Sequence, residues 1–387
     1  MERNNSQLKI LQICSSPSWG GLEMHVALIS EKLRQSGHEV LPVCFKNGFL
    51  EGHLKKLNFH PIGLKLNTYV APGGIKSLRQ IIKQRNIDVI HCHYSKDLWI
   101  IVPAKQGLKN VKVVLSKHVG TARSKKDPFH KWLYSHVDHI AAVSRMIYHN
   151  ILQTHPISKD KVSVIYPGID LERFNPNLYD AKKVKHELGW HPETRVIGIV
   201  SRIQIGKGFL EFLQMARQIS ERLPDVRFLI VGGATFGEEE EARYILNRIR
   251  DLNLQEKIYC TGTTDQVSKY LSCMDIFVFP SRAESFGMAL VEAMAMQKPV
   301  IACNKDGIQD IIEPHKNGIL VPPRDVNSLV QAVQNLLQDE KTRKHLAIQA
   351  RRTIEKKFDI YSTILKLEDL FWSLISGTKQ SIKYIKN

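Results

Sequence analysis

Two glutamates, Glu284 and Glu292, lie eight residues apart where the chain leaves an apolar segment. The apolar run 276–280 predicts a buried strand, and Ser285-Phe286-Gly287 opens a helix rich in Ala and Met. A helix N-terminus presents unpaired N–H groups that attract phosphate, and carboxylates accept hydrogen bonds from hydroxyl groups. This segment therefore predicts a binding site for a phosphorylated sugar.

Two further loops combine glycine with charged side chains after a predicted strand. Trp19-Gly20-Gly21-Leu22-Glu23 opens the first predicted helix, and its glycines let the backbone approach a ligand. Its spacing differs from the Gly-x-Gly-x-x-Gly loop of dinucleotide-binding proteins. The run from Ser201-Arg202 to Lys207-Gly208 offers a planar arginine fork and a mobile lysine, which both suit phosphate oxygens.

Together these segments resemble the family 4 retaining glycosyltransferases, which have the GT-B fold. Glu284 and Glu292 match the family's E-x7-E signature, with Pro280-Ser281 before it and Gln297-Lys298-Pro299-Val300 after it. The Gly20–Glu23 segment is similar to the GGxE loop, and Arg202 and Lys207 are similar to the R-x4-K-G pattern. The resemblance covers nearly the full length; it is strongest over 196–323 and weakest over 47–86.

The resemblance implies roles for these residues. Arg202 and Lys207 would hold the donor pyrophosphate and stabilise the leaving group, so no metal and no other cofactor is expected. Glu284 would bind the sugar hydroxyls and Glu292 the ribose hydroxyls, and Gly21 would contact the donor phosphate. The full donor-binding set is Gly20, Gly21, Glu23, Ser201, Arg202, Lys207, Thr261, Gly262, Glu284, Ser285, Phe286, Gly287, Met288 and Glu292.

His118 follows the predicted strand 112–116, and Val119 separates it from Gly120. It resembles the histidine loop that the family places near the anomeric carbon of the donor, and a purely structural histidine is the alternative. The implied catalytic set is His118, Arg202, Lys207 and Glu284.

Two other segments give weaker signals. His91-Cys92-His93 has the residue types of a metal site, but neighbouring residues of a strand point to opposite faces and no distant ligands complete a cluster. The segment from Asp306 to Asp310 lies where relatives carry a glycine-rich loop with a glutamate, and its single glycine leaves its role undecided.

A chain of 387 residues is too long for one typical core, which favours two domains. Short apolar strands alternate with amphipathic helices in both halves, which is typical of doubly wound parallel sheets. The expected fold is α/β GT-B, with two Rossmann-like domains facing a central cleft. The expected parts are an acceptor-binding domain at 1–168, a linker at 169–190, a nucleotide-sugar-binding domain at 191–357, and a helical tail at 358–387 that packs back toward the first domain.

The expected strands lie at 8–13, 39–45, 88–91, 112–116, 139–143 and 162–165, and then at 196–200, 227–231, 257–260, 276–279, 300–302 and 319–321. The first helix is expected from about Met24 to Gln35, with an apolar stripe of Val26, Ile29 and Leu33, and with Gly37 ending it. Later helices are expected near 209–222, 238–252, 265–273 and 287–296, and 328–375 is expected to be nearly all helix.

The net charge of +17 is concentrated in the first half, where residues 1–170 hold 24 Lys and Arg against 11 Asp and Glu. A basic face favours an anionic partner, and no recognised nucleic-acid module supports nucleic acid. An anionic lipid-linked or glycan acceptor, or an anionic membrane surface, is expected instead. The candidate acceptor or membrane surface comprises Arg123, Lys125, Lys126, Lys131 and Trp132, with Lys379, Lys383 and Lys386 of the tail adding to it. An ordinary amphipathic helix packed on the sheet is the alternative for 123–136.

The six cysteines are scattered without a Cys-x-x-Cys pair, which favours a reducing compartment and buried thiols. No apolar run is long enough to span a bilayer, and the polar N-terminus is unlike a signal peptide. The expected location is the cytoplasm, with peripheral attachment to the inner face of the cytoplasmic membrane.

The resulting hypothesis is a retaining glycosyltransferase that uses a nucleotide-diphosphate sugar to build a bacterial surface glycan of the lipopolysaccharide type. Three alternatives stay open. One is a nucleotide-sugar epimerase or phosphorylase of the same fold, the second is a non-catalytic nucleotide-sugar-binding adaptor, and the third is a nucleic-acid binder suggested by charge alone.

Overall fold

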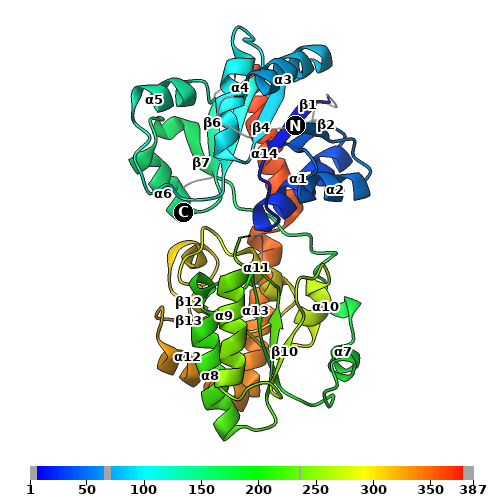
Figure 1. The fold of residues 1–387 in the computed structure, drawn as a ribbon, viewed down its shortest axis with the longest axis vertical. Coiled ribbons are helices and arrows are strands. Elements are labelled where there is room, and N and C mark those ends of the chain that lie inside the picture. The colour runs from blue at the N-terminus through cyan, green and yellow to red at the C-terminus, as the bar shows by residue number, and fades with distance from the viewer. Residues whose placement is uncertain (1–6, 65–70, 235–236, 378–387) are drawn as a thin grey trace. The chain divides into compact units, whose positions relative to one another are not determined.

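The computed structural model describes residues 7–64, 71–234 and 237–377. The chain divides into two compact units. Unit 1 comprises 1–167 together with 361–387, and unit 2 comprises 168–360. Each unit is built around its own parallel sheet (Figure 1).

The sheet of unit 1 has the strand order β3-β2-β1-β4-β5-β6-β7 with every pair parallel. Its order reverses direction between β1 and β4, which is the topological switch point where α/β proteins bind ligands. The strands are β1 (Lys9–Cys14), β2 (Glu39–Phe45), β3 (Ile62–Leu64), β4 (Val89–Cys92), β5 (Lys112–Lys117), β6 (His139–Ala142) and β7 (Val162–Val164).

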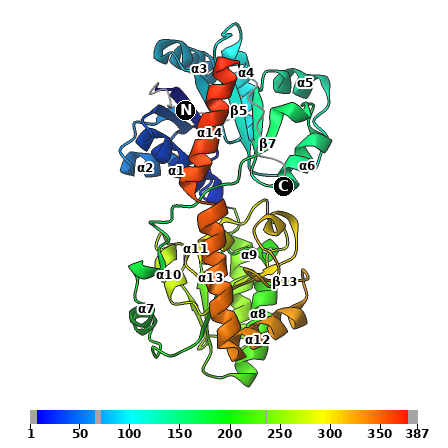
Figure 2. The same cartoon turned by 180° about the vertical axis from the view of Figure 1, so that it is seen from behind.

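The helices of unit 1 pack on this sheet by apolar stripes. The stripe of Val26, Ile29 and Leu33 on the first helix is buried, as its spacing predicts. On the last helix, α14, which is seen in front in Figure 2, Phe371 makes a ring contact with His91 of β4, with centroids 5.4 Å apart. The helices are α1 (Gly21–Gln35), α2 (Phe49–Lys56), α3 (Pro72–Arg85), α4 (Leu98–Lys105), α5 (Pro128–Ser135), α6 (Arg145–Thr154) and α14 (Ile360–Ser376), with short 3₁₀ turns η1 (Ser95–Asp97) and η2 (Lys159–Lys161).

The sheet of unit 2 has the order β10-β9-β8-β11-β12-β13, again all parallel, and its switch point lies between β8 and β11. The strands are β8 (Val196–Val200), β9 (Arg227–Val231), β10 (Ile258–Cys260), β11 (Ile276–Phe279), β12 (Val300–Cys303) and β13 (Ile319–Val321). Alternate residues of these strands, such as Ile197 and Ile199, join one core with α8, α9 and α12.

Two further helices of unit 2, α11 and α13, contact each other, and α13 is seen in front in Figure 2. The helices are α7 (Ala181–Glu187), α8 (Phe209–Arg222), α9 (Glu239–Asp251), α10 (Val267–Ser272), α11 (Met288–Ala295), α12 (Val326–Gln338) and α13 (Glu340–Lys357), with 3₁₀ turns η3 (Pro176–Leu178), η4 (Ile205–Lys207) and η5 (Asp306–Asp310).

Several expected element bounds were wrong by a few residues. The first helix begins at Gly21 rather than near Met24, because extended Gly20 serves as its N-cap and its carbonyl accepts a bond from Met24 N–H. In the segment 123–136, only Pro128–Ser135 is helical, with Pro128 at the first helical position. Strand β3 was not predicted, because it has three residues and includes Gly63.

The six cysteines are all free, and five are buried, among them Cys14, Cys44 and Cys303 as expected. Cys260, at the end of an edge strand, is exposed. Within 7–64, 71–234 and 237–377, no helix is both long and apolar enough to cross a membrane. The lysines of the tail, Lys379, Lys383 and Lys386, lie outside the described residues.

Candidate functional site

In unit 2, the predicted donor residues gather around the switch point of the sheet. Strands β8 and β11 are neighbours, so the loops that follow their carboxyl ends lie side by side. The loop after β8 carries Ser201, Arg202 and Lys207, and the loop after β11 carries Glu284 and Ser285. The fold therefore brings together two segments that are about eighty residues apart in the chain.

An ion pair joins these two loops. The Nζ atom of Lys207 lies 2.6 Å from Oε1 of Glu284, and both side chains are largely withdrawn from solvent, with 19% and 13% of their surface exposed. A charge-assisted contact of this length in a partly dry position orients both groups more firmly than a surface ion pair would.

Backbone contacts fix the loop that carries Lys207. Gly206 accepts a bond of 2.9 Å from Arg282 N–H, and the Arg282 guanidinium lies 2.7 Å from Glu211 of α8. Gly208 has a φ of +79°, and a Cβ atom at that position would lie 2.1 Å from the carbonyl oxygen of Pro280. Only glycine therefore fits at the point where the two loops cross.

A second ion pair involves Arg202, the other predicted phosphate contact. Its Nη1 atom lies 3.3 Å from Oε1 of Glu238, which precedes α9. Glu241 in the first turn of α9 accepts a bond of 2.7 Å from the backbone N–H of Ile205. The acidic residues at the start of α9 thus bind the loop after β8 twice, once through the Arg202 side chain and once through the backbone of Ile205.

The predicted phosphate-binding start of α11 is formed as a tight crossing with η5. Gly287 is the N-cap, with a φ of +112°. Gly307 donates its N–H to the Glu284 carbonyl at 3.0 Å, and a Cβ on Gly307 would lie 2.4 Å from the Ser285 carbonyl oxygen. Gly307 was left without a role by sequence reasoning, and the structure places it as the support of the Glu284 loop.

The remaining predicted contacts of unit 2 flank this centre. Glu292 lies on α11, half-buried, and burial raises its pKa to about 7, while Arg173 acts in the opposite direction. Phe286 is buried against Phe358, so its side chain serves the core. Thr261 follows β10, and its hydroxyl accepts a bond of 3.3 Å from Gly232 N–H.

The loop after β10 continues with Gly262, which forms a bridge with Gly232 of the loop after β9. Met288 opens α11 and is half-buried. These residues lie at the same carboxyl edge of the sheet as Lys207 and Glu284.

In unit 1, the glycine loop and His118 lie at the corresponding edge. Gly20 and Gly21 connect the end of β1 to α1, and the first-turn residue Glu23 is 3% exposed. The Glu23 carboxylate turns back over the loop, since one of its oxygens lies 3.6 Å from where a Cβ on Gly20 would be. His118 directly follows β5 and is half-buried.

His118 belongs to a cluster of four histidines that sequence reasoning did not assemble. His93 Nδ1 lies 3.4 Å from His118 Nε2, and the rings of His91 and His93 are 4.1 Å apart. The rings of His25, on α1, and His118 meet in an edge-type contact, with centroids 5.3 Å apart. The pair His91 and His93 could have been noticed as one face of a strand, since residues i and i+2 point the same way.

Burial keeps this cluster uncharged. It lowers the pKa of His25 to about 4 and that of His91 to about 3, and it holds the pKa values of His93 and His118 well below the usual range. The neighbouring imidazoles add to the effect for His91, His93 and His118. At neutral pH the cluster therefore consists of neutral rings, each with one N–H donor and one acceptor nitrogen.

The expected acceptor or membrane surface is exposed. Arg123, Lys126 and Lys131 face solvent, and Lys125 is half-buried. Helix α5 presents Phe129 and Trp132 with 72% and 40% of their surface exposed. Leu133 of the same helix is buried, so α5 packs on the unit with one side only.

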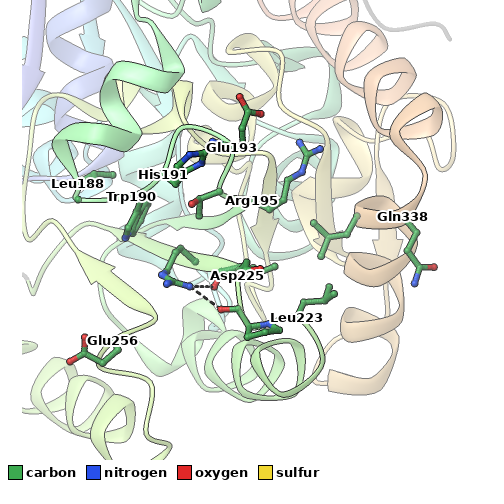
Figure 3. A pocket seen from close by; sticks show the side chains of 15 residues that line it. Leu188, Trp190, His191, Glu193, Arg195, Leu223, Asp225, Glu256 and Gln338 are labelled. Atoms are coloured by element: carbon green, nitrogen blue, oxygen red, sulfur yellow. Dashed lines mark hydrogen bonds between the residues drawn. The ribbon is translucent and has the colours of Figure 1, made fainter.

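A cavity in the described part of unit 2 lies away from these residues. It has a volume of about 850 Å³ and lies in unit 2 beside the amino ends of β8 and β9, among residues such as Trp190 and Asp225 (Figure 3). Arg195 on its wall is paired with Asp275 at 3.0 Å, and Arg227 bonds the carbonyls of Pro224 and Val226. Because its arginines are already engaged and the loops after the strands carry the chemistry, we assign no donor site to this cavity.

In the described residues, no three His, Cys, Asp or Glu side chains are arranged to hold a metal ion. This applies to the histidine cluster as well as to the carboxylates of unit 2.

The family models match both units. A model described as Glycosyltransferase Family 4 matches residues 19–173, and one described as Glycosyl transferases group 1 matches residues 180–353. The chain belongs to the group 1 glycosyltransferases.

Individual relatives agree with this assignment. The chain is 24% identical over 390 residues to the UDP-Gal:alpha-D-GlcNAc-diphosphoundecaprenol alpha-1,3-galactosyltransferase of Escherichia coli, covering 97% of this chain and 99% of that one. Among solved structures, a glycosyltransferase from Rickettsia africae superimposes with a TM-score of 0.85 at 23% identity, covering 96% and 100% of the two chains. Anabaena Alr3699/HepE in complex with UDP-glucose gives 0.82 at 22% identity, covering 95% and 100%. With the two parallel sheets, these likenesses show the GT-B fold.

Proposed function

We propose that this glycosyltransferase retains anomeric configuration, needs no metal, and transfers a sugar from a nucleotide-diphosphate donor to an acceptor of bacterial surface-glycan synthesis of the lipopolysaccharide type. The observation that carries the proposal is the Lys207–Glu284 pair of 2.6 Å at the switch point of unit 2. It sets a cation for phosphate and a carboxylate for sugar hydroxyls beside each other, as a sugar diphosphate requires.

Each charged group has a proposed task in the chemistry. Lys207 and Arg202 neutralise the charge that develops on the diphosphate as the glycosidic bond breaks, which is the task of a metal ion in other transferases. Glu284 orients the sugar through its hydroxyls, and Glu292 binds the ribose. The acceptor hydroxyl attacks the anomeric carbon from the face that the diphosphate leaves, and the diphosphate accepts its proton.

The relatives favour a particular donor and acceptor class. The Escherichia coli relative is named for a UDP-Gal donor and a diphosphoundecaprenol-linked acceptor, and the Anabaena neighbour was solved with UDP-glucose. We therefore propose a UDP-sugar as donor and a sugar linked to a lipid diphosphate, or a growing polysaccharide, as acceptor.

A lipid-linked acceptor requires that the enzyme reach a membrane. The exposed aromatic rings of Phe129 and Trp132 next to Arg123, Lys126 and Lys131 have the composition of an interfacial surface. We propose that this surface attaches the protein peripherally to the anionic inner face of the cytoplasmic membrane.

A transfer assay tests the proposal. The purified chain is incubated with UDP-galactose, UDP-glucose or UDP-N-acetylglucosamine and a synthetic GlcNAc-diphospholipid, with excess EDTA and with added Mg²⁺ or Mn²⁺ in parallel. The expected result is an α-linked product formed equally fast in both conditions. A β-linked product from these α-linked donors, or a strict need for metal, would refute the retaining or metal-independent part.

The same assay separates the alternatives. Conversion of the donor into an epimer without acceptor would indicate an epimerase. Binding of the UDP-sugar without turnover on any acceptor would favour an adaptor.

A further inference from the structure

The four-histidine cluster of unit 1 contains one chain of hydrogen bonds. Gln12 of β1 is fully buried, and its Oε1 lies 2.7 Å from His93 Nε2. His93 Nδ1 in turn lies 3.4 Å from His118 Nε2. His93 therefore uses both ring nitrogens, one toward the centre of the sheet and one toward His118.

His93 is held more firmly than His118. Its backbone N–H donates to the Ile13 carbonyl at 3.0 Å, and only 3% of its surface is exposed. The ring of His91 lies tilted beside it, with centroids 4.1 Å apart, and is itself fixed by a bond of 2.8 Å to Ser116. His118 is half-buried at the end of β5, so a fixed ring contacts a more accessible one.

The cluster lowers the stability of the core in which it lies. Gln12 Nε2, His25 Nδ1 and His91 Nδ1 are buried and have no hydrogen-bond partner within the described part of the chain. An unsatisfied buried polar group costs about 1–3 kcal/mol, so apolar residues would serve stability better here. The arrangement at the switch point of unit 1 therefore favours a functional reason.

We propose that His93 is a positioning residue for the transfer reaction and that it acts by fixing the ring orientation and tautomer of His118. With the Gln12 oxygen as acceptor, His93 donates from Nε2 and accepts at Nδ1. His118 then donates its Nε2–H to His93, and its own Nδ1 is left as an acceptor for a hydroxyl of the donor sugar. This inference rests on the proposed function, because it requires that His118 contacts the donor.

The two ends of His93 can be tested separately. The amide of Asn matches the position of Nδ1, and the amide of Gln matches that of Nε2. His93→Asn therefore keeps a partner for His118 and gives up Gln12, whereas His93→Gln keeps Gln12 and gives up His118. As a control, His139→Gln changes another buried histidine, whose Nε2 contacts Ser163 at 2.8 Å outside the cluster.

The readout is kcat and KM in the transfer assay, using whichever of the three UDP-sugars is turned over fastest with the GlcNAc-diphospholipid. We expect His93→Gln to lower kcat by about tenfold or more and to raise the KM for the UDP-sugar, since the oriented hydrogen bond of His118 to the donor is lost. His93→Asn is expected to keep kcat within about threefold, because the bond to His118 is restored. His139→Gln is expected to match the wild type. Equal losses in the Asn and Gln variants would overturn the proposal.

A double-mutant cycle with His118→Ala shows whether His93 acts through His118. In the His118→Ala background, His93→Gln should cause no further loss of kcat, and a loss by the same factor as in the wild type would contradict the proposal. If the His93 variants do not fold, Gln12→Met enters the cycle and the same non-additivity is expected. Wild-type kcat in His118→Ala alone would reject the role of His118 in the proposed function, whereas an additive cycle would reject only the role of His93.

Discussion

The switch points of the two sheets hold their side chains in opposite electrostatic states. Between β8 and β11 of unit 2, Lys207 pairs with Glu284, and Arg202 pairs nearby with Glu238. Between β1 and β4 of unit 1 lies the histidine cluster, whose rings burial keeps neutral. The same parallel topology thus presents paired charges in one unit and uncharged imidazoles in the other.

This difference matches the two halves of a sugar-diphosphate donor. A diphosphate gains negative charge when the glycosidic bond breaks and needs fixed cations, whereas the anomeric carbon becomes electron-poor and would be repelled by an imidazolium. A ring with a low pKa can lie near that carbon and offer only a lone pair or a neutral N–H.

The largest expected effect comes from removing a charge at the switch point of unit 2. Lys207→Met should lower kcat/KM by about 10²–10³-fold, because it removes stabilisation of the leaving group and leaves Glu284 unpaired. Lys269→Met is the matched control, because it breaks a more exposed pair with Glu187 of similar length, 2.7 Å. Comparable losses in both variants, measured by UDP release, would remove the special role of Lys207.

The crossing of the two loops gives the next effect. Gly208→Ala should destabilise unit 2 by about 2–4 kcal/mol, since the new Cβ meets the Pro280 carbonyl and the backbone has a positive φ. Gly206→Ala, two residues earlier, meets no atom within 4 Å and should cost less than about 1 kcal/mol. Urea unfolding of the two variants measures the difference, and equal midpoints would mean that the loops do not cross as described.

The opposite electrostatics also predict opposite pH dependences of stability. Glu292 has a raised pKa of about 7, so the folded state binds a proton that the unfolded state has released between about 4.5 and 7. Stability from this group therefore falls as pH rises through that window. The free energy of unfolding of Glu292→Gln, relative to that of the wild type, should therefore rise by about 1–3 kcal/mol from pH 4.5 to pH 8. A difference between the two proteins that is constant with pH would contradict this.

The histidines of unit 1 act with the other sign. His91 has a lowered pKa of about 3, so the unfolded state binds the extra proton below about 6.5, and the stability from His91 is lost as pH falls toward 3. His91→Gln can keep the contact to Ser116 without titrating. Its free energy of unfolding relative to that of the wild type, measured by urea unfolding, should rise by about 1–2 kcal/mol when the pH is lowered from 7.5 to 4.5. No change in this difference would contradict the assignment.

The smallest effect is expected at the surface of unit 1. Replacing Arg123, Lys126 and Lys131 by Glu should weaken binding to vesicles that contain anionic lipid by about 1 kcal/mol for each cation removed. The same change to Lys182 and Lys183, exposed residues of α7 in unit 2, is the control. The assay is sedimentation with the vesicles. If the Arg123/Lys126/Lys131 triple variant binds as well as the Lys182/Lys183 double variant, this surface is excluded as the attachment site.

Much of the fold and the charged half of the site could be predicted from the sequence. The loops with Arg202, Lys207 and Glu284 carry their signal locally, because each follows an apolar strand and contains residue types that bind phosphate or hydroxyls. Gly208 and Gly307 also had to be glycine, but only the crossing of distant loops explains why.

The neutral half of the site could not be predicted in the same way. Gln12, His25, His93 and His118 come from four segments, and no spacing links them until the strand order β1-β4-β5 is known. Each by itself has the appearance of a core residue. His91, on β4, and His93, directly after it, have the residue types of a metal site, and nothing in their spacing indicates the hydrogen bond between His93 and His118.

The central proposal is that Lys207 of unit 2 binds the diphosphate of the donor through its charge and that His118 of unit 1 contacts the sugar. Calorimetric titration with UDP, which lacks the sugar, and then with the UDP-sugar tests it most directly. Lys207→Met should weaken binding of both ligands by about tenfold or more, whereas His118→Ala should leave UDP binding within about twofold of the wild type and weaken only the UDP-sugar. Equal loss of UDP binding in both variants, or unchanged UDP binding in Lys207→Met, would contradict the account.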